Sequence, residues 1–358
     1  MRNSKRFAAM AFVAAFGLVA AACGDDAKKS DTTTADTTGD TTADTTGDTT
    51  APSDLKVGVA FDTGGRGDGT FNDSAGRGAD QAKTDLGATV QELEATTEAD
   101  RQPNLEALSA AGNNPIVAVG FAFGDALTIV AAANPDVTYA WVDGYLDLPN
   151  VKTLSFAAEQ GSFLVGAAAA LKCGCDHIGF IGGQEIDLIK AFEAGYTAGA
   201  KQINPNITVE VQYLGAAGDN AAWGSPDKAK EIALGWYNTK GVEVIYSAAG
   251  GSGQGTIDAA VEADKWAIGV DSDQYLTATP EQQAHILTSM LKRVDNAVFQ
   301  TIKAVQDGDI SGGFKLFDLS VDGVGYSTSG GYLDEFASQL DDLKAQIIAG
   351  DIVVPTAP

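Results

Sequence analysis

Carboxylates and aromatic rings follow several predicted strands of this sequence. In residues 57–75, VGVAFDTGGRGDGTFNDSA, a buried Val-rich run ends at Asp62, four glycines come next, and Phe71 and Asn72 precede a helical pattern. Glycine adopts positive φ readily and lets the backbone approach a ligand closely. Because ligands of open α/β sheets bind beyond the carboxyl ends of strands, this stretch predicts a binding loop. The alternative is an ordinary strand-to-helix loop whose phenylalanine belongs to the core.

Four further loops at predicted strand ends carry similar side chains. Their aromatic rings, carboxylates and glycines are Phe121, Phe123, Asp125, Trp223, Gly250, Gly251 and Asp271. One cation, Lys292, begins the predicted helix 292–307. Such a set suits a flat polar molecule with hydroxyl groups, because rings stack on its faces and carboxylates accept from O–H and N–H. Taken singly, each residue also fits core packing or helix capping.

One glycine-rich stretch permits an enzyme as an alternative. Gly251, Gly253 and Gly255 follow a predicted strand, and Asp271 ends the next strand, as in a dinucleotide-binding unit. That fingerprint requires G-x-G-x-x-G, and Thr256 stands where its last small residue belongs. The sequence holds no Ser-His-Asp or Cys-His arrangement, so we expect a binding protein without catalysis or a cofactor.

The spacing of the cysteines and histidines does not match that of a metal site. Cys173 and Cys175 form a C-G-C that permits either a local disulfide or two thiols. A zinc site would need a second such pair. His177 and His285 lie far apart in the sequence, and we expect structural roles for both.

Length and charge narrow the class of protein further. A chain of 358 residues fits about two domains, and a hydrophobic content of 44% is normal for a folded soluble protein. The formal net charge is −25. Nucleic-acid binding needs a basic footprint, so we expect no nucleic-acid partner.

The N-terminal region has the features of an export signal. Residues 1–22 begin with three basic side chains and continue with an uncharged, mostly apolar stretch, 7–22, that is short for a membrane span. The ending LVAAAC resembles a bacterial lipoprotein processing site with Cys23 as the lipidated residue; an ordinary cleaved signal peptide is the alternative. Thr/Asp-rich repeats in 23–54 offer almost nothing to bury and predict a disordered tether.

Strand and helix patterns alternate from residue 55 onward. We expect strands near 55–61, 88–94, 115–119, 137–142, 151–157, 177–181, 207–214, 242–247, 266–270 and 285–290, and a short strand pair near 314–326. We expect helices near 73–86, 101–112, 124–133, 159–172, 187–203, 226–238, 254–264, 292–307 and 332–349. This alternation predicts parallel sheets with helices on both faces. Asp73 or Ser74 is the expected N-cap of the first helix.

The order of the loop motifs resembles the basic membrane protein family. The motifs are D-x-G-G-x-G-D-x-x-F-N-x-S-A, V-G-F-x-x-x-D-A, Y-A-W-V-D, I-G-F-I-G-G, A-A-G-G-S-G, I-G-V-D-S-D-Q and T-S-M-L-K-R-V-D. These proteins are substrate-binding lipoproteins of ABC importers and include purine nucleoside receptors. The resemblance implies a type I periplasmic-binding-protein fold with two doubly wound parallel-sheet lobes, three crossovers and a ligand in the cleft. We expect 55–157 plus 273–307 in the N-terminal lobe and 158–272 plus 308–358 in the C-terminal lobe.

The resemblance also implies which residues contact a nucleoside base. Phe71 resembles the family's base-stacking aromatic residue, and its neighbour Asn72 belongs to the expected site. Asp62 and Asp125 resemble the carboxylates that contact the base. Trp223 is the candidate where the family usually offers a phenylalanine, in a loop of unusual sequence, AAGDNAAWGSP.

A second group of residues is implied for the sugar. Asp271 resembles the acceptor of the ribose hydroxyls, with Lys292 as its cationic partner, and the backbone of Gly250 and Gly251 would line the wall. The expected protein is a monomer, anchored through Cys23 on the extracytoplasmic face of the membrane, that delivers a nucleoside, in particular a purine nucleoside, to an ABC permease. A sensor that signals to a membrane receptor and a receptor for a flavin-type ligand are the alternatives within this fold.

Overall fold

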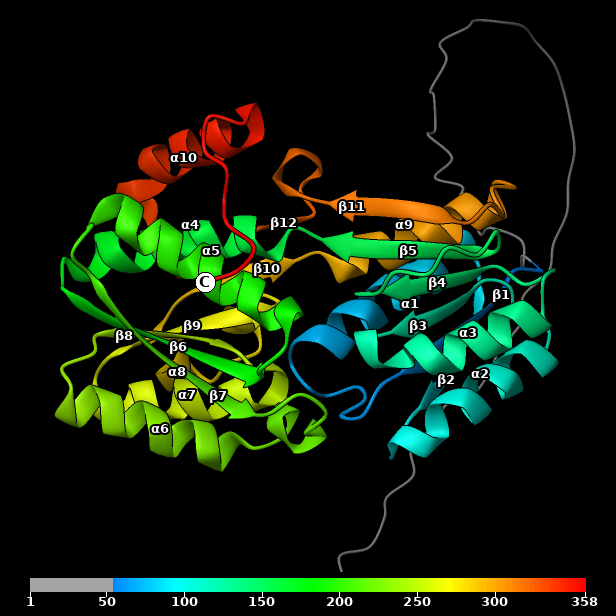
Figure 1. The fold of residues 1–358 in the computed structure, drawn as a ribbon, viewed down its shortest axis with the longest axis horizontal. Coiled ribbons are helices and arrows are strands. Elements are labelled where there is room, and N and C mark those ends of the chain that lie inside the picture. The colour runs from blue at the N-terminus through cyan, green and yellow to red at the C-terminus, as the bar shows by residue number, and fades with distance from the viewer. Residues whose placement is uncertain (1–53) are drawn as a thin grey trace, which may run out of the picture. The chain divides into compact units, whose positions relative to one another are not determined.

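Two parallel sheets organise the part of the chain that the structure, a computed structural model, describes, which is residues 54–358 (Figure 1). The first sheet has the strand order β11-β5-β4-β3-β1-β2. Its strands are β1 (Lys56–Phe61), β2 (Thr89–Glu94), β3 (Ile116–Val119), β4 (Tyr139–Val142), β5 (Val151–Phe156) and β11 (Gly313–Phe317). Every pairing within it is parallel, as the alternation of strand and helix patterns predicts.

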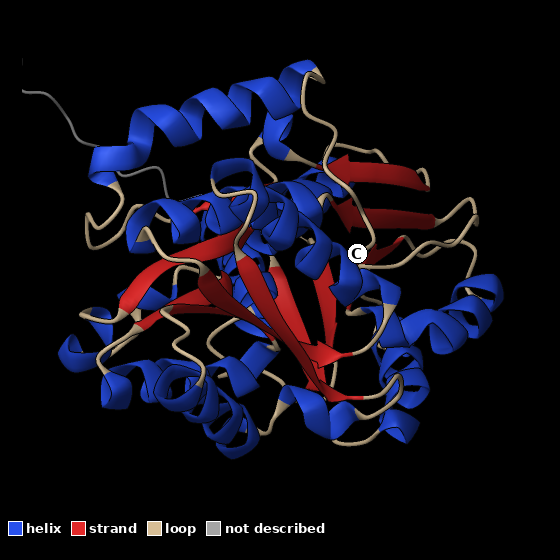
Figure 2. Cartoon of the chain, turned by 60° about the vertical axis from the view of Figure 1, so that its left-hand side comes forward, coloured by secondary structure: helices blue, strands red, loops and turns tan. Residues whose placement is uncertain are grey.

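The second sheet has the strand order β12-β10-β9-β8-β6-β7. Its strands are β6 (His177–Gln184), β7 (Thr208–Gly215), β8 (Val244–Ala248), β9 (Trp266–Asp271), β10 (Ile286–Lys292) and β12 (Val324–Tyr326). Its pairings are parallel except that of β10 with β12, which is antiparallel. The central strands read as continuous apolar runs because helices cover both faces of the sheet (Figure 2).

Ten α-helices connect these strands within residues 54–358. They are α1 (Phe71–Leu86), α2 (Arg101–Ala110), α3 (Gly124–Ala133), α4 (Ala158–Cys173), α5 (Asp187–Ile203), α6 (Pro226–Thr239), α7 (Gly253–Ala263), α8 (Pro280–Gln283), α9 (Val294–Gln306) and α10 (Ala337–Ala349). Short 3-10 turns occur in several loops, and four of them that follow strands are η1 (Glu98–Asp100), η2 (Phe121–Phe123), η3 (Asn220–Trp223) and η4 (Gly250–Ser252).

Glycines allow two helices of the second lobe to pack with their backbones almost in contact. A Cβ atom added to Gly166 of α4 would lie 2.1 Å from the carbonyl oxygen of Tyr196 in α5. A Cβ atom on Gly199 of α5 would lie 1.9 Å from the carbonyl oxygen of Phe163 in α4. Both distances are far below a van der Waals contact, so larger residues at these positions would push the helices apart.

The assignment of the C-terminal strands to the lobes differs from the sequence-based expectation. β10, expected in the N-terminal lobe with 273–307, pairs with β9 of the second sheet, since the intervening chain carries only the short helix α8. The helix α9 that follows packs against α1 of the first lobe, as expected. The chain therefore crosses between lobes after β5, after β10 and after β11, which confirms three crossovers. The second boundary moves from residue 272 to the end of β10, and the third moves from residue 307 to the end of β11.

The expectation that two short strands near 314–326 pair with each other is wrong. β11 extends the first sheet next to β5, with Phe317 opposite Phe156 and the two rings stacked at a centroid distance of 5.2 Å. β12 instead pairs with β10 in the second sheet. The two short strands therefore belong to different lobes, and the segment between them is the third crossover.

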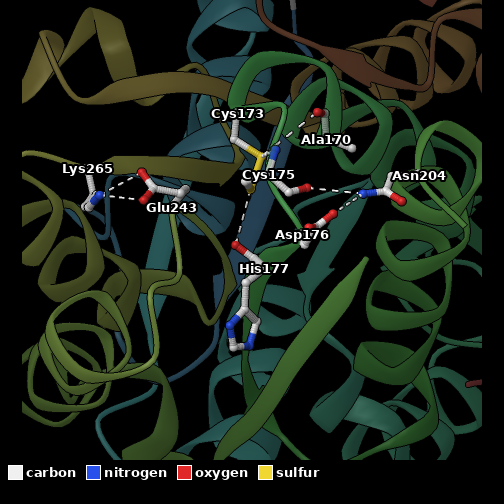
Figure 3. Close-up of a disulfide and its surroundings, with 8 residues drawn as sticks. All are labelled: Ala170, Cys173, Cys175, Asp176, His177, Asn204, Glu243 and Lys265. Carbon is white, nitrogen blue, oxygen red and sulfur yellow. Dashed lines mark hydrogen bonds and ion pairs between the residues drawn. A yellow bond between two sulfur atoms is a disulfide. The ribbon is translucent and has the colours of Figure 1, made fainter. Parts of the chain in front are cut away.

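The two neighbouring cysteines, for which the sequence permitted a disulfide or two thiols, form a disulfide. Cys173 and Cys175 are bonded to each other at the end of α4, around Gly174, whose φ is +53° (Figure 3). His177, close by, contacts the carbonyl oxygen of Lys240 and the carboxylate of Glu210. The histidine ring is thus held by protein partners, as expected for a structural residue.

Two further findings concern only the described residues. Within residues 54–358 no three His, Cys, Asp or Glu side chains are arranged to hold a metal ion. No helix in that part of the chain has the length and apolar character needed to cross a bilayer. The predicted signal peptide, Cys23 and nearly all of the predicted tether lie outside the described residues.

Candidate ligand-binding site

A cavity of about 200 Å³ lies between the two lobes, and both lobes contribute residues to its wall. Eight of the nine predicted ligand-binding residues line it. They are Asp62, Phe71 and Asn72 from the first lobe and Trp223, Gly250, Gly251, Asp271 and Lys292 from the second. All lie at the carboxyl ends of strands or in the connections that follow them, up to the first residues of α1, so the carboxyl edges of both sheets face the cavity.

Asp125 is the predicted residue that does not line the cavity. The turn η2 separates β3 from α3, so Asp125 lies in the first turn of α3 with its side chain exposed. Phe121, at the start of η2, lines the cavity in this loop. Asp125 is therefore removed from the candidate site.

The glycine-rich loop after β1 is organised by Asp68. Its carboxylate accepts the backbone N–H groups of Thr70, Asn72 and Asp73 and also the side-chain amide of Asn72. These are donors that a helix start leaves free, so Asp68 caps α1, which begins at Phe71. The expectation of an N-cap at Asp73 or Ser74 is wrong, because the helix begins earlier. The side-chain oxygen of Asn72 is buried without a hydrogen-bond partner.

Asp62, which lines the cavity, forms an ion pair with Arg101. Its Oδ1 lies 2.8 Å from Nε of Arg101, and the two side chains are largely buried, with exposed fractions of 16% and 10%. Gly120, whose φ is +119°, faces the other carboxylate oxygen: a Cβ atom there would lie 3.4 Å from Oδ2 of Asp62. A side chain would therefore fit beside the carboxylate, and it is the positive φ of this position that favours glycine.

Lys292 pairs with Asp143 and not, as expected, with Asp271. Its Nζ lies 2.5 Å from Oδ2 of Asp143, and both side chains are almost fully buried. The reason is topological: Lys292 ends β10 and Asp143 follows β4, so the pair joins the ends of two strands from opposite sheets. The Lys292 ammonium also lies 4.8 Å and 5.8 Å from the ring centroids of Phe71 and Phe192, within range of cation–π attraction.

Asp271 is left as the buried carboxylate without a direct partner. It ends β9 with φ of +64°, is 8% exposed and lines the cavity. Within residues 54–358 its carboxylate accepts no hydrogen bond. Burial raises the pKa of Asp271 to about 7, the Lys292 ammonium opposes this rise, and the Asp143 and Asp68 carboxylates add to it. The carboxylate is therefore free to accept hydrogen bonds from a bound molecule.

Trp223 forms the aromatic wall on the second lobe. Its ring lies directly over Gly183 of β6: a Cβ atom at that glycine would come within 2.2 Å of the indole. The edge of the indole meets Phe121 of the first lobe at a centroid distance of 6.4 Å and an interplanar angle of 63°. Aromatic rings from both lobes therefore border the same space.

The lobes also contact each other beside the cavity. The hydroxyl of Ser272 donates to the carbonyl oxygen of Thr70 at 2.6 Å and accepts from Nη2 of Arg77 at 2.8 Å. Ser272 follows Asp271, and Thr70 precedes Phe71. This contact therefore fixes two residues of the site, one from each lobe, relative to each other.

Several lining residues were not predicted from the sequence. Asp143 had a usable signal, because it follows a strand and ends the Y-A-W-V-D motif. Phe121 was a loop aromatic but was not chosen for the site. Phe192 lies inside α5 and Asn220 in an irregular loop, so neither position has a pattern that separates it from core or surface.

Two α/β lobes with a cavity at their facing strand ends define the solute-binding proteins of the type I periplasmic-binding fold. The structure resembles that of an ABC transporter solute-binding protein from Aeropyrum pernix K1, with a TM-score of 0.73 and 28% identity over 84% of this chain and 94% of that one. The chain belongs to the family of PnrA-like ABC transporter substrate-binding proteins, which matches residues 55–357.

Curated relatives extend the comparison. The CD4+ T-cell-stimulating antigen of Listeria innocua is 34% identical over 98% of both chains. The ABC transporter nucleoside-binding protein BmpA of Lactococcus lactis is 33% identical over 85% of this chain and 90% of its own. The chain is thus an extracytoplasmic substrate-binding component of an ABC transporter, with a small-molecule ligand and a membrane permease as partners.

Proposed function

We propose that this protein binds a nucleoside, in particular a purine nucleoside, in the cavity between its lobes and delivers it to the permease without catalysis. The relative from Lactococcus lactis is named a nucleoside-binding protein. The observation that carries the proposal is the arrangement of Asp271, a buried acceptor without a partner, in a cavity bordered by Phe71, Phe121 and Trp223. Rings suit the faces of a base, and a free carboxylate suits the vicinal hydroxyls of a ribose.

The Lys292–Asp143 pair supplies the charge balance at the sugar end of the proposed complex. Lys292 has three donors, and the bond to Asp143 uses one of them, so the ammonium can still donate to a sugar oxygen. Hydrogen bonds to charged groups contribute about 1.5–3 kcal/mol each. A ribose that bonds both Asp271 and Lys292 therefore adds appreciably to the affinity, whereas a free base leaves Asp271 without a partner.

Calorimetric titration tests this proposal. Wild type and Asp271→Asn are titrated with inosine, guanosine, adenosine and the matching free bases. We expect wild type to prefer nucleosides over bases and the variant to lose at least about tenfold in nucleoside affinity, which corresponds to about 1.4 kcal/mol. Equal affinity for base and nucleoside in wild type would remove Asp271 from the site. A folded protein that binds none of these compounds and binds riboflavin would replace the nucleoside by a flavin-type ligand.

Attachment to the membrane through a lipid on Cys23 is part of the same proposal. It is supported by the LVAAAC sequence at the end of the apolar N-terminal stretch. An anchored receptor stays close to the permease, which favours transfer of the ligand at low receptor numbers.

A further inference from the structure

The 3-10 turn η3, between β7 and α6, connects the cavity to the opposite lobe. Its first residue, Asn220, and its last, Trp223, both line the cavity. The side-chain amide of Asn220 also donates to Oε1 of Glu98 at 2.5 Å. Asn220 belongs to the second lobe and Glu98 to η1 of the first, so this hydrogen bond spans the cleft.

On the second lobe, η3 is held firmly by buried side chains. Gln184, which is 1% exposed, donates to Oδ1 of Asn220 at 3.2 Å and accepts the N–H of Gly218 at 2.9 Å. The buried hydroxyl of Ser252 donates to the carbonyl oxygen of Ala222 at 2.8 Å. Because these hydrogen bonds fix η3 to β6 and η4, Asn220 and Trp223 are held in one rigid turn and move together.

On the first lobe, Glu98 is linked to the cavity wall through Arg101. Thr97 and Asp100 form a capping box around η1. Arg101 follows at once and holds Asp62, which lines the cavity. Asn220 is thus itself a cavity-lining residue, whereas the segment of Glu98 does not line the cavity and is linked to it by the ion pair of Arg101 with Asp62.

We propose that the Asn220–Glu98 hydrogen bond is a latch that holds the lobes closed over the bound ligand, with Asn220 and Glu98 as positioning residues. The bond can form only when the lobes are closed, so it stabilises the closed state and not the open one. Its loss should increase the rate of ligand release and leave the rate of association nearly unchanged. The identity of the ligand rests on the proposed function; the latch itself rests on the contact between the lobes.

Glu98 offers the decisive variant because it does not line the cavity. Glu98→Ala, Asn220→Ala and the double variant are compared with wild type by stopped-flow measurement of inosine release, with tryptophan fluorescence as the signal. We expect each single variant to release inosine about two- to fivefold faster, the range for an exposed charged hydrogen bond. The double variant should be no faster than the Asn220→Ala variant, because both changes remove the same bond. Asn206→Ala, an exposed position of the second lobe, is the matched control and should release inosine at the wild-type rate.

Unchanged release from Glu98→Ala, with faster release from Asn220→Ala, would show that Asn220 only contacts the ligand, and would overturn the latch. If wild type does not bind inosine, the nucleoside proposal fails and the latch is tested without ligand. Hydrogen exchange of residues 216–224 should then be faster in Glu98→Ala than in Asn206→Ala. Equal exchange in these two variants would overturn the latch independently of the ligand.

Discussion

Lys292 and Asp143 form an ion pair that joins the two lobes, with Nζ and Oδ2 2.5 Å apart and side-chain exposures of 3% and 5%. The two residues are 149 positions apart in the chain and end strands of different sheets. Removing one partner of a buried pair leaves a desolvated charge, and this costs more than the intact pair contributes. The pair therefore couples the stability of the closed arrangement to the integrity of the ligand site.

Asp143→Ala is expected to lower the free energy of unfolding by about 3–5 kcal/mol, because it leaves the buried ammonium of Lys292 unpaired. Urea denaturation measures this change. Adding Lys292→Met should recover most of the loss, since the charge is then gone. Asp307→Ala, which removes an exposed partner of Lys303, is the control and should leave stability unchanged within error. A loss in Asp143→Ala no larger than in this control would contradict the prediction.

The raised pKa of Asp271 predicts that the ligand-free protein loses stability as the pH rises. The folded state holds the proton up to about pH 7, whereas an unfolded aspartate releases it near pH 4. The stability contributed by this proton is therefore fully present below about pH 4 and is lost progressively as the pH rises to about 7. We expect the difference in unfolding free energy between Asp271→Asn and wild type to grow in favour of the variant across this range. Parallel pH profiles of the two proteins would contradict the assignment.

The same titration predicts stronger nucleoside binding at higher pH. The ionised Asp271 accepts hydrogen bonds from two hydroxyls, whereas the protonated form has lost part of its acceptor capacity. Inosine affinity of wild type should therefore rise between pH 6 and pH 8, and that of Asp271→Asn should stay flat. Calorimetry at several pH values in matched buffers provides the measurement; an affinity that falls with pH in wild type would be incompatible with a carboxylate acceptor.

Gly183→Ala should weaken ligand binding although Gly183 does not line the cavity. Its new methyl group would come within 2.2 Å of the Trp223 ring and would displace it. If Trp223 stacks on a base, the loss should approach the roughly 1–3 kcal/mol measured when a stacking aromatic residue is removed. Gly235→Ala, at a helix position where the added carbon meets no neighbour within 4 Å, is the matched control and should bind as wild type does. Unchanged affinity in Gly183→Ala would mean that the position of Trp223 is irrelevant to the ligand.

Cys23→Ala should abolish fatty-acid labelling and release the protein from membranes, because Cys23 is the proposed site of lipidation. Metabolic labelling and membrane fractionation of cells that express each protein provide the measurement. Cys173→Ala, which breaks the Cys173–Cys175 disulfide but leaves Cys23 in place, is the control and should remain attached. A Cys23→Ala protein that stays in the membrane fraction would rule out this anchor.

The sequence alone was sufficient for the alternating architecture and for eight residues of the cavity wall. A strand ends where its apolar run ends, and in a parallel sheet all carboxyl ends lie at one edge. Asp62, Phe71 and Asp271 could therefore be placed at the cleft from local patterns. Lys292, predicted at a helix start, instead ends β10 and still reaches the cavity, because the strand and helix adjoin at the same edge.

The tertiary structure decided which of these side chains act together. The partner of Lys292 depends on how two sheets face each other, and no local pattern encodes a contact across 149 residues. Asp125 does not line the cavity, because the turn η2 separates it from the end of β3 and its side chain is exposed to solvent. Phe192 lines the cavity although it lies inside a helix. The placement of β10 and β11 was likewise fixed by available sheet edges. Local sequence sets what each strand end carries, but the crossovers between lobes determine which strand ends meet.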